Sequence, residues 1–383
     1  MSDLHDLGRG RTGTLVHEAM TARASGQWEA VHQLAVTLTG QAVDANPVTA
    51  SLYRGAPALA YALHSAHHKS YSTALSRLDD ELAALVGRRL ASARQRMDFG
   101  VPPRMREYDL ISGLTGLGAL LLYRRNQRRV LRDVLHYTVR LLRRPVRVGG
   151  RSVPGWWCSD APSGRPDAGE WPYGHGNFGM AHGVAGPIAL LALALRAGIE
   201  VPGQKEALLS GINLLERWAR PLPGGGAVWP ETLPLHAWEE GPTTTGRTGR
   251  PSWCYGTPGI ARALQLAALT THQLRSQLTA EKIVASCLAD PSQLAKVQEA
   301  SVCHGWAGLL LAAELTAADA DPDSRINRHL HKIRAQFGLL LARGQIPGGA
   351  GLLTGADGVR LVGRTFDPIQ PVDPGWATCL LLI

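Results

Sequence analysis

One pattern recurs along the 383-residue chain and constrains its fold more than any other feature. A turn containing glycine is followed by a small residue, by a second Gly or Pro, and by an apolar run of helical character. The turn glycines are separated by 58, 70, 73 and 49 residues, about the length of two helices and a loop. Each copy is therefore predicted to contain a helix pair. The copies begin at Tyr53, Asp109, Asn177, Trp253 and Cys303, and a weaker sixth copy, DPGWATCLLLI, begins at Asp373.

Two kinds of helix alternate in the sequence. The segments after the glycines are apolar all round, as in ALLALAL at 189–195, which is typical of helices buried on every side. The segments between them are amphipathic, and 130–142 carries leucine and valine on one face and arginine on the other. This alternation predicts an all-α fold, an α/α toroid of six to seven helix pairs. The inner helices would begin at one face, where glycine lets their turns crowd around a central bowl.

The expected organisation is a single toroid domain over residues 46–383, preceded by a partly helical N-terminal segment, 1–45. Two loops rich in Gly, Pro and Trp, 145–176 and 221–251, are expected over the bowl. Strand signals are poor, so one small hairpin is expected at most, and 146–153 and 358–362 are the only short runs of suitable residues. The chain start lacks an apolar signal segment, and the longest uncharged stretch is too short to span a membrane. We expect a cytoplasmic protein, or one peripheral at the inner membrane face.

Five cysteines form an odd and sparse set, which argues against a disulfide framework. Cys254 and Cys303 stand at equivalent positions of neighbouring repeats, and His304 follows Cys303 directly. Two thiolates and one imidazole would fill three positions of a tetrahedral zinc ion and leave the fourth open, as in catalytic zinc sites. The alternative is that all three are buried packing residues, since free cysteine is often buried. Equivalent repeat positions favour the metal site. The other cysteines are assigned to packing: Cys158, Cys287 and Cys379.

Four sequence strings, in this order, resemble the lanthionine synthetase C-like proteins, the cyclases of lanthipeptide biosynthesis. They are PGWW at 154–157, NFGMAHGVAGP at 177–187, SWCYGTPGIARALQLA at 252–267 and SVCHGWAGLL at 301–310. The resemblance runs from about Tyr53 to the C-terminus, and it implies an α/α toroid around a zinc ion. It also implies zinc ligands at Cys254, Cys303 and His304, acid–base groups at Asp109 and His182, and cavity-lining residues at Arg250 and Tyr255. The degenerate sixth copy departs from the family pattern and leaves the closure of the ring open.

Each of these roles has a structural alternative. Asp109 could cap a helix beginning near Leu110, as aspartate often does. His182 could be a hydrogen-bonded core histidine, and Tyr255, like Trp253, could serve packing alone. Residues His175, Trp156 and Trp157 of the first long loop are weaker candidates for substrate contact.

The chemistry that the resemblance implies is the formation of (methyl)lanthionine thioether rings. A cysteine thiol of a precursor peptide adds to dehydroalanine or dehydrobutyrine, residues made beforehand by a separate dehydratase. Zinc would favour the thiolate, His182 would protonate the α-carbon, Asp109 would orient His182 or accept the thiol proton, and Arg250 would stabilise the enolate oxygen. A membrane exporter is a further expected partner.

Three other functions remain open at this point. An α/α toroid glycosidase would need two carboxylates about 5–10 Å apart in the bowl. A non-catalytic peptide-binding scaffold would keep zinc for structure alone. A third alternative keeps the zinc and adds an external thiol such as glutathione.

The chain carries a net charge of +9, and much of it lies in one arginine-rich stretch. The arginines fit either a solvated outer helix face or a docking surface for an acidic leader peptide or a partner enzyme. No nucleic-acid motif accompanies them, so no nucleic acid is expected as partner. The stretch comprises Arg124, Arg125, Arg128, Arg129, Arg132, Arg140, Arg143, Arg144, Arg147 and Arg151.

Overall fold

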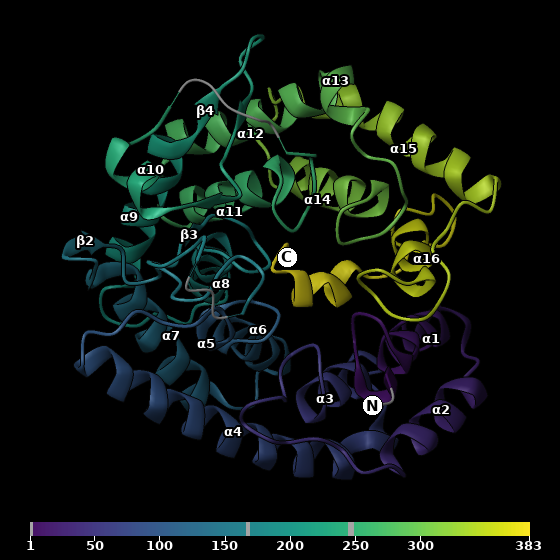
Figure 1. Ribbon diagram of the computed structural model, residues 1–383. Helices are drawn as coiled ribbons and strands as arrows, with labels where there is room; N and C mark the ends of the chain where they lie inside the picture. The colour runs from purple at the N-terminus through teal and green to yellow at the C-terminus, as the bar shows by residue number, and fades with distance from the viewer. Residues whose placement is uncertain (1–2, 166–168, 244–248) are drawn as a thin grey trace.

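The computed structural model describes residues 3–165, 169–243 and 249–383, and helices arranged in two concentric layers dominate it (Figure 1). Seven of the described helices form the inner ring. They are α1 (Arg11–Ser25), α3 (Ala56–Ser65), α6 (Leu114–Arg124), α8 (Ala185–Arg196), α11 (Thr257–Thr270), α14 (Trp306–Ala318) and α16 (Ala356–Thr365). Each packs against the next along the chain, and α16 packs against α1, so the ring is closed. The predicted α/α toroid is confirmed.

The outer layer covers this ring and connects its members. Its long helices are α2 (Glu29–Thr39), α4 (Ser72–Asp98), α7 (Arg128–Arg143), α9 (Gln204–Trp218), α12 (Leu274–Ala289) and α15 (Asn327–Ala342). The short helical elements of the structure, which are assigned to neither layer, are η1 (Asp3–His5), η2 (Lys69–Tyr71), α5 (Met105–Tyr108), α10 (Leu235–Glu240), α13 (Pro291–Leu294) and η3 (Pro374–Leu380). Every long outer helix packs on the inner helix that precedes it. The predicted helix pairs are therefore present.

Burial follows the two sequence patterns. In α8 every residue from Ala185 to Ala194 is buried, because the helix is surrounded by α6, α9 and α11. In α7, Leu131, Val134 and Leu135 are buried, whereas most arginines of the opposite face are exposed and Arg140 is half-buried. A helix whose side chains are apolar on all faces is thus an inner helix, and an amphipathic helix is an outer one.

A second glycine stands three residues after the first in every repeat except that of α3, and a close approach of backbone to backbone requires it. A Cβ atom on Gly259 would lie 2.0 Å from the carbonyl oxygen of Trp253, and one on Gly308 would lie 1.9 Å from that of Val302. A side chain at either position would push the preceding turn away from its helix. These glycines therefore hold the turn residues against the start of the inner helix.

The two ends of the chain correct the predicted repeats. The inner helices α1 and α16 begin directly after Gly10 and Gly355 and carry the second glycines, Gly13 and Gly358, in their first turns, and neither copy is among the predicted repeats. The prediction of a sixth inner copy at Asp373 is wrong, because these residues form η3, which lies inside the ring. The degenerate copy therefore has no part in ring closure. The domain boundary at residue 45 stays a prediction, although α1 packs between α16 and α3.

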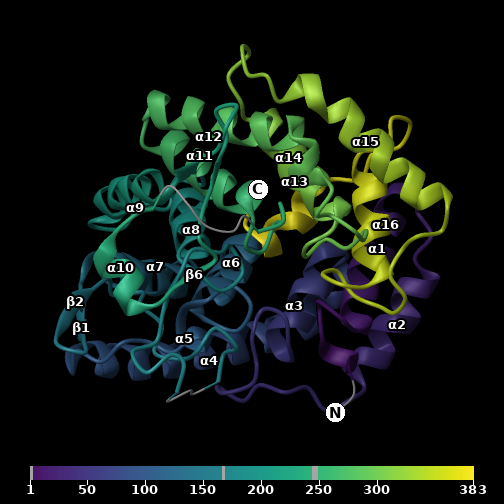
Figure 2. The ribbon, with the colours of Figure 1, turned by 45° about the horizontal axis from the view of Figure 1, so that its top comes forward.

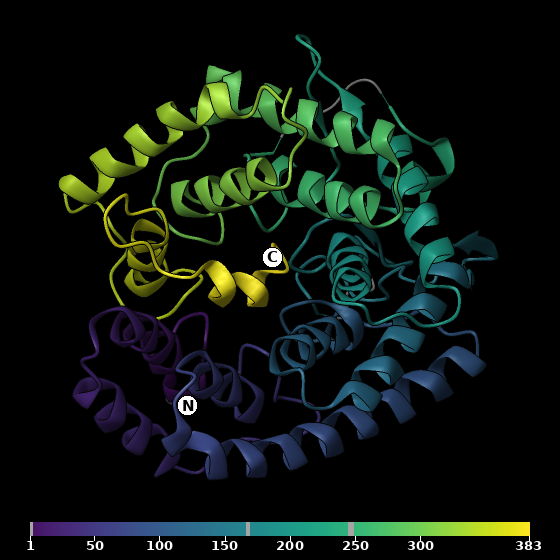
Figure 3. The same ribbon diagram turned by 180° about the vertical axis from the view of Figure 1, so that it is seen from behind.

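The C-terminal segment lies within the ring in all three views (Figures 1, 2 and 3). Residues from Trp376 to Leu382 are buried, and side chains of the inner helices and of the turns before them bind their backbone. Tyr61 donates from its hydroxyl to the carbonyl of Trp376 at 2.6 Å, and Trp253 donates from Nε1 to that of Leu380 at 3.0 Å. The centre of the toroid is thus filled by the chain's own end.

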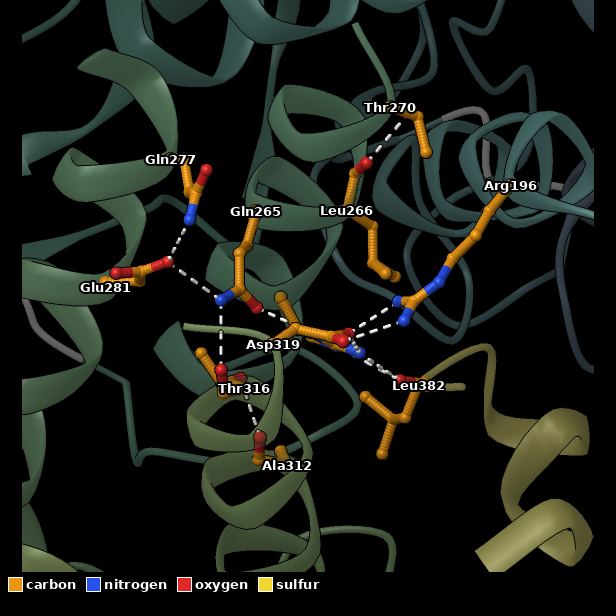
Figure 4. A network of polar contacts seen from close by, with 11 residues as sticks. Arg196, Gln265, Leu266, Thr270, Gln277, Glu281, Ala312, Thr316, Asp319 and Leu382 are labelled. Atoms are coloured by element: carbon orange, nitrogen blue, oxygen red, sulfur yellow. Dashed lines mark hydrogen bonds and ion pairs between the residues drawn. The ribbon is translucent and has the colours of Figure 1, made fainter. Parts of the chain in front are cut away.

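A buried arginine fixes the last turn of this segment. Arg262 of α11 donates from Nε and Nη2 to the carbonyl of Leu382, at 3.0 and 2.8 Å, and from Nη2 to Asp319 at 2.7 Å. Asp319 also accepts two hydrogen bonds from Arg196, and Gln265 links this group to Glu281 (Figure 4). Helices α8, α11, α12 and the end of α14 are thereby joined to the C-terminus.

The long loops carry the described strands, all in short antiparallel pairs. β1 (Val146–Val148) and β2 (Arg151–Val153) form a hairpin, β4 (Arg220–Pro221) pairs with β5 (Ala227–Val228), and β3 (Gly176–Asn177) pairs with β6 (Thr232–Leu233). The expectation of one small hairpin at most is therefore wrong, because the two long loops form short ladders of their own. The β3–β6 pair ties the two loops together. The residues at 358–362, which have a weak strand pattern in the sequence, form no strand, because they belong to α16. Parts of both loops, 166–168 and 244–248, lie outside the described residues.

Within the described residues, none of the helices is long and apolar enough to cross a membrane.

Candidate active site and metal centre

The turns that precede the inner helices are linked by backbone hydrogen bonds around the axis of the ring. Ala181 N donates to Cys254 O at 3.1 Å, Cys254 N to Cys303 O at 3.3 Å, and Cys303 N to Leu353 O at 2.9 Å. Each of these residues stands two positions before the first glycine of its repeat. We call this chain of turns the hydrogen-bonded belt. It places equivalent residues of successive repeats side by side, which is why Cys254 and Cys303 are neighbours.

The predicted metal ligands lie together in this belt. The sulfur atoms of Cys254 and Cys303 and a ring nitrogen of His304 lie within 4.8 Å of one another. A serine supports each of the two turns, since Ser252 Oγ accepts from Tyr255 N at 3.4 Å and Ser301 Oγ accepts from His304 N at 3.3 Å. Adjacent residues Cys303 and His304 can converge because the helix begins only at Trp306.

The electrostatics of this group suit a metal with soft ligands. The interaction with the neighbouring Cys303 thiol lowers the pKa of Cys254, although burial opposes the change. The same interaction, together with burial, raises the pKa of Cys303. Of the two thiols, Cys254 is therefore the one that ionises more readily. Two sulfurs and one imidazole nitrogen fit a zinc ion with one position left for another ligand.

Asp109 and His182 form a hydrogen-bonded pair beside the metal group. Asp109 Oδ2 lies 2.6 Å from His182 Nδ1, and the Asp109 side chain is only 1% exposed, against 30% for His182. Burial lowers the pKa of His182, but the Asp109 carboxylate outweighs this effect and raises it above the usual value. The ring is thus held protonated further into the neutral range, with its other nitrogen available.

The capping alternative for Asp109 is partly correct. Its second oxygen, Oδ1, accepts from Ser112 N at 2.6 Å, which closes the turn between α5 and α6. The helix itself begins at Leu114 rather than near Leu110, and Gly113 is its N-cap. One carboxylate therefore shapes the turn and binds His182 at the same time.

Tyr255 and Arg250 approach the same group from the α11 turn. The ring centroids of Tyr255 and His182 are 6.1 Å apart, and burial raises the pKa of the Tyr255 hydroxyl, which therefore stays protonated. Arg250 is exposed, and its charge reaches both the Cys303 thiol and the carboxylate of Glu231. All seven predicted site residues thus gather at one end of the ring.

Two acidic residues near the metal group were missed in the sequence. Burial and the Cys254 sulfur raise the pKa of Glu231, which stands at the start of β6. Glu299 Oε1 lies 3.3 Å from His304 Nε2. Counting back six residues from Gly256 and Gly305 leads to Arg250 and Glu299, so the repeat contained a signal for Glu299. The sequence contained no such signal for Glu231.

The weaker candidates for substrate contact serve packing instead. His175, Trp156 and Trp157 are at most 2% exposed, and the two tryptophans stack edge-on with Trp238. They form the core beneath the long loops. The remaining cysteines are buried and free, as predicted, and burial raises the pKa of each thiol to about 12: Cys158, Cys287 and Cys379.

Ring and site together define the chain as an α/α toroid with a Cys/Cys/His group at its mouth that could hold a metal ion. The chain belongs to the lanthionine synthetase C-like family, whose model matches residues 5–370. Among curated proteins, the nisin biosynthesis protein NisC of Lactococcus lactis subsp. lactis is 24% identical over 327 residues, which cover 84% of this chain and 74% of NisC. A solved structure of nisin cyclase superposes with a TM-score of 0.79 at 21% identity, over 100% of this chain and 93% of that one. The predicted family membership is confirmed.

Proposed function

We propose that this protein is a zinc-dependent lanthipeptide cyclase. It adds cysteine thiols of a dehydrated precursor peptide to dehydroalanine or dehydrobutyrine and so forms (methyl)lanthionine rings. The observation that carries the proposal is the three-ligand group of Cys254, Cys303 and His304 beside the Asp109–His182 pair. Membership in the lanthionine synthetase C-like family supports the same activity.

The ligands proposed for zinc are Cys254, Cys303 and His304, because they offer two sulfurs and one nitrogen within 4.8 Å. When bound there, zinc supplies a thiolate nucleophile at neutral pH by binding the substrate thiol. The protein's part is to keep the two thiols and the imidazole converged, through the hydrogen-bonded belt and the serines of both turns.

The proton needed by the product comes from His182 in this proposal. Addition of sulfur at the β-carbon leaves an enolate, and protonation of its α-carbon completes the ring. Asp109 raises the pKa of His182 and so favours its protonated form, and the hydrogen bond to Nδ1 leaves Nε2 for the substrate. Arg250, which is exposed and cationic, can stabilise the negative enolate oxygen. The substrate thiol releases its proton to solvent. His182 takes up a proton from solvent before the next cycle, so the protons balance.

The proposed partners follow from this chemistry. The substrate is a precursor with leader and core segments, and a separate dehydratase provides its dehydro residues. An exporter at the membrane would remove the product, and the enzyme would act in the cytoplasm or at the inner membrane face. Of the arginine-rich stretch, Arg124, Arg140 and Arg151 pair with acidic residues of this chain, so only the remainder can serve a leader or partner.

The direct test is incubation with a dehydrated precursor, followed by alkylation of free thiols. Ring formation leaves the mass unchanged but protects each reacted cysteine, so alkylation should decrease with time. Thiols that stay fully alkylatable would contradict the proposal. A mass increase that needs glutathione would support addition of an external thiol instead. Activity on a glycan would support the glycosidase alternative, which the engagement of Asp109 with His182 and Ser112 disfavours.

A further inference from the structure

Glu299 is the acidic side chain that faces the predicted ligand His304. Its Oε1 atom lies 3.3 Å from His304 Nε2, and the two side chains are 37% and 30% exposed. The carboxylate is fixed by the same turn, because Oε2 accepts from Ser301 N at 2.8 Å and Oε1 accepts from Ser301 Oγ at 2.6 Å. Ser301 in turn receives the backbone N–H of His304. Carboxylate, serine and imidazole therefore form one connected unit.

The repeat supplies an internal comparison for this unit. Arg250 and Glu299 both stand six residues before the first glycine of their repeats. Their backbones are equivalent, since a Cβ atom on Gly256 would lie 2.6 Å from Arg250 O, and one on Gly305 would lie 2.4 Å from Glu299 O. In the turn before α11, where Tyr255 precedes the glycine, this position is an arginine. In the turn before α14, where the predicted ligand His304 precedes the glycine, it is a glutamate.

We infer that Glu299 is a positioning residue that accepts the Nε2–H of His304 and thereby leaves Nδ1 as the nitrogen that binds the metal. A neutral imidazole has one N–H, so the hydrogen bond to one nitrogen decides which other nitrogen is free. Ligand histidines commonly donate their second ring nitrogen to a carboxylate, which fixes the ring and raises its basicity. The His304 ring also interacts with the Cys254 sulfur, which is a second member of the proposed zinc group. The inference rests on the proposed zinc site.

The test measures zinc affinity in the full-length protein, by competition with a chromophoric chelator, and so does not depend on cyclisation. Glu299→Ala should weaken zinc binding about 10- to 100-fold, the usual effect of losing such a partner. Glu299→Gln should lose less, because its amide oxygen can still accept the N–H. Gln298→Ala, at the exposed neighbouring position, is the matched control and should bind zinc as the wild type does.

The wild type also permits a test that needs no variant. In protein labelled with 15N-histidine and loaded with zinc, His304 should show a protonated Nε2 and a metal-bound Nδ1. The reverse tautomer would overturn the inference, as would unchanged zinc affinity in Glu299→Ala or an equal loss in Gln298→Ala. If Glu299→Ala fails to fold, the tautomer decides. A wild type that binds zinc but forms no rings would refute the proposed function and leave this inference standing.

Discussion

Replacing Gly308 by alanine tests whether the close packing of turn against helix holds the metal ligands in place. A Cβ atom here would lie 1.9 Å from the carbonyl oxygen of Val302, about 1.5 Å short of the 3.4 Å at which ordinary contact begins. The obstacle is backbone, so no side-chain rotation relieves it. Val302 directly precedes Cys303, and relief of the contact must therefore displace a predicted ligand.

Two opposing effects set the magnitude. Alanine is favoured over glycine inside a helix by about 1 kcal/mol. Overpacking a well-packed interior costs about 1–3 kcal/mol, and an immobile backbone contact belongs at the upper end. The expected net loss for Gly308→Ala is thus about 2 kcal/mol of unfolding free energy. Gly338→Ala is the matched control, because this exposed glycine of α15 has nothing within 4 Å of an added Cβ.

Urea denaturation of both metal-free variants, together with zinc titration of each, gives the readout. Gly308→Ala should unfold at lower urea than the wild type and bind zinc more weakly. Gly338→Ala should be equal to or slightly more stable than the wild type, with unchanged zinc affinity. Equal behaviour of the two variants would refute the packing argument.

Three further changes probe the site and the ring. Asp109→Asn removes a charge-assisted hydrogen bond of about 1.5–3 kcal/mol, so ring formation should slow about 10- to 100-fold. Because Asp109 raises the pKa of His182, the decline of the rate with rising pH should also begin at lower pH in this variant, as a pH–rate profile would show. Arg262→Met leaves the carbonyl of Leu382 without its donor and should cost about 3 kcal/mol in urea denaturation. Burial raises the pKa of Asp319, but hydrogen bonds from Arg196 and Arg262 lower it to about 2. The stability that this carboxylate provides should therefore be complete near neutral pH and be lost as the pH falls towards 2, more steeply in the wild type than in Asp319→Asn.

The sequence predicted the ring because its two helix types differ in the property that packing requires. An inner helix such as α8 must be apolar all round, and an outer helix such as α7 must keep a polar face, so both patterns are visible in the chain. The equivalence of Cys254 and Cys303 was also visible, because the belt joins the same position of adjacent repeats.

Other features could not be predicted from periodicity. The pairs Gly10/Gly13 and Gly355/Gly358 mark the starts of helices with arginines and aspartate among their residues, so the apolar run after each pair is too weak to indicate a repeat. The segment at Asp373 keeps the apolar composition of an inner helix because it is buried within the ring, although it forms a 3-10 turn. In this segment the apolar composition indicates burial, but it does not indicate which type of helix the residues form.

The acidic residues of the site depended on tertiary contacts. Glu231 reaches the metal group through the pairing of β3 with β6, and strands of two residues are too short to show alternation. Glu299 was detectable only by aligning the turns on their glycines, which connects it with Arg250. Its contact with His304 requires the backbone course of the turn.

A comparison of Cys303→Ala with Cys287→Ala tests whether the Cys/Cys/His group holds the zinc that ring formation requires. Both cysteines are largely buried, but only Cys303 belongs to the predicted metal group. Zinc content and protection of precursor thiols from alkylation are measured on the same preparations. The account predicts that the wild type and Cys287→Ala hold zinc and form rings, whereas Cys303→Ala loses both. A Cys303→Ala protein that keeps its zinc and its ring-forming activity would contradict it.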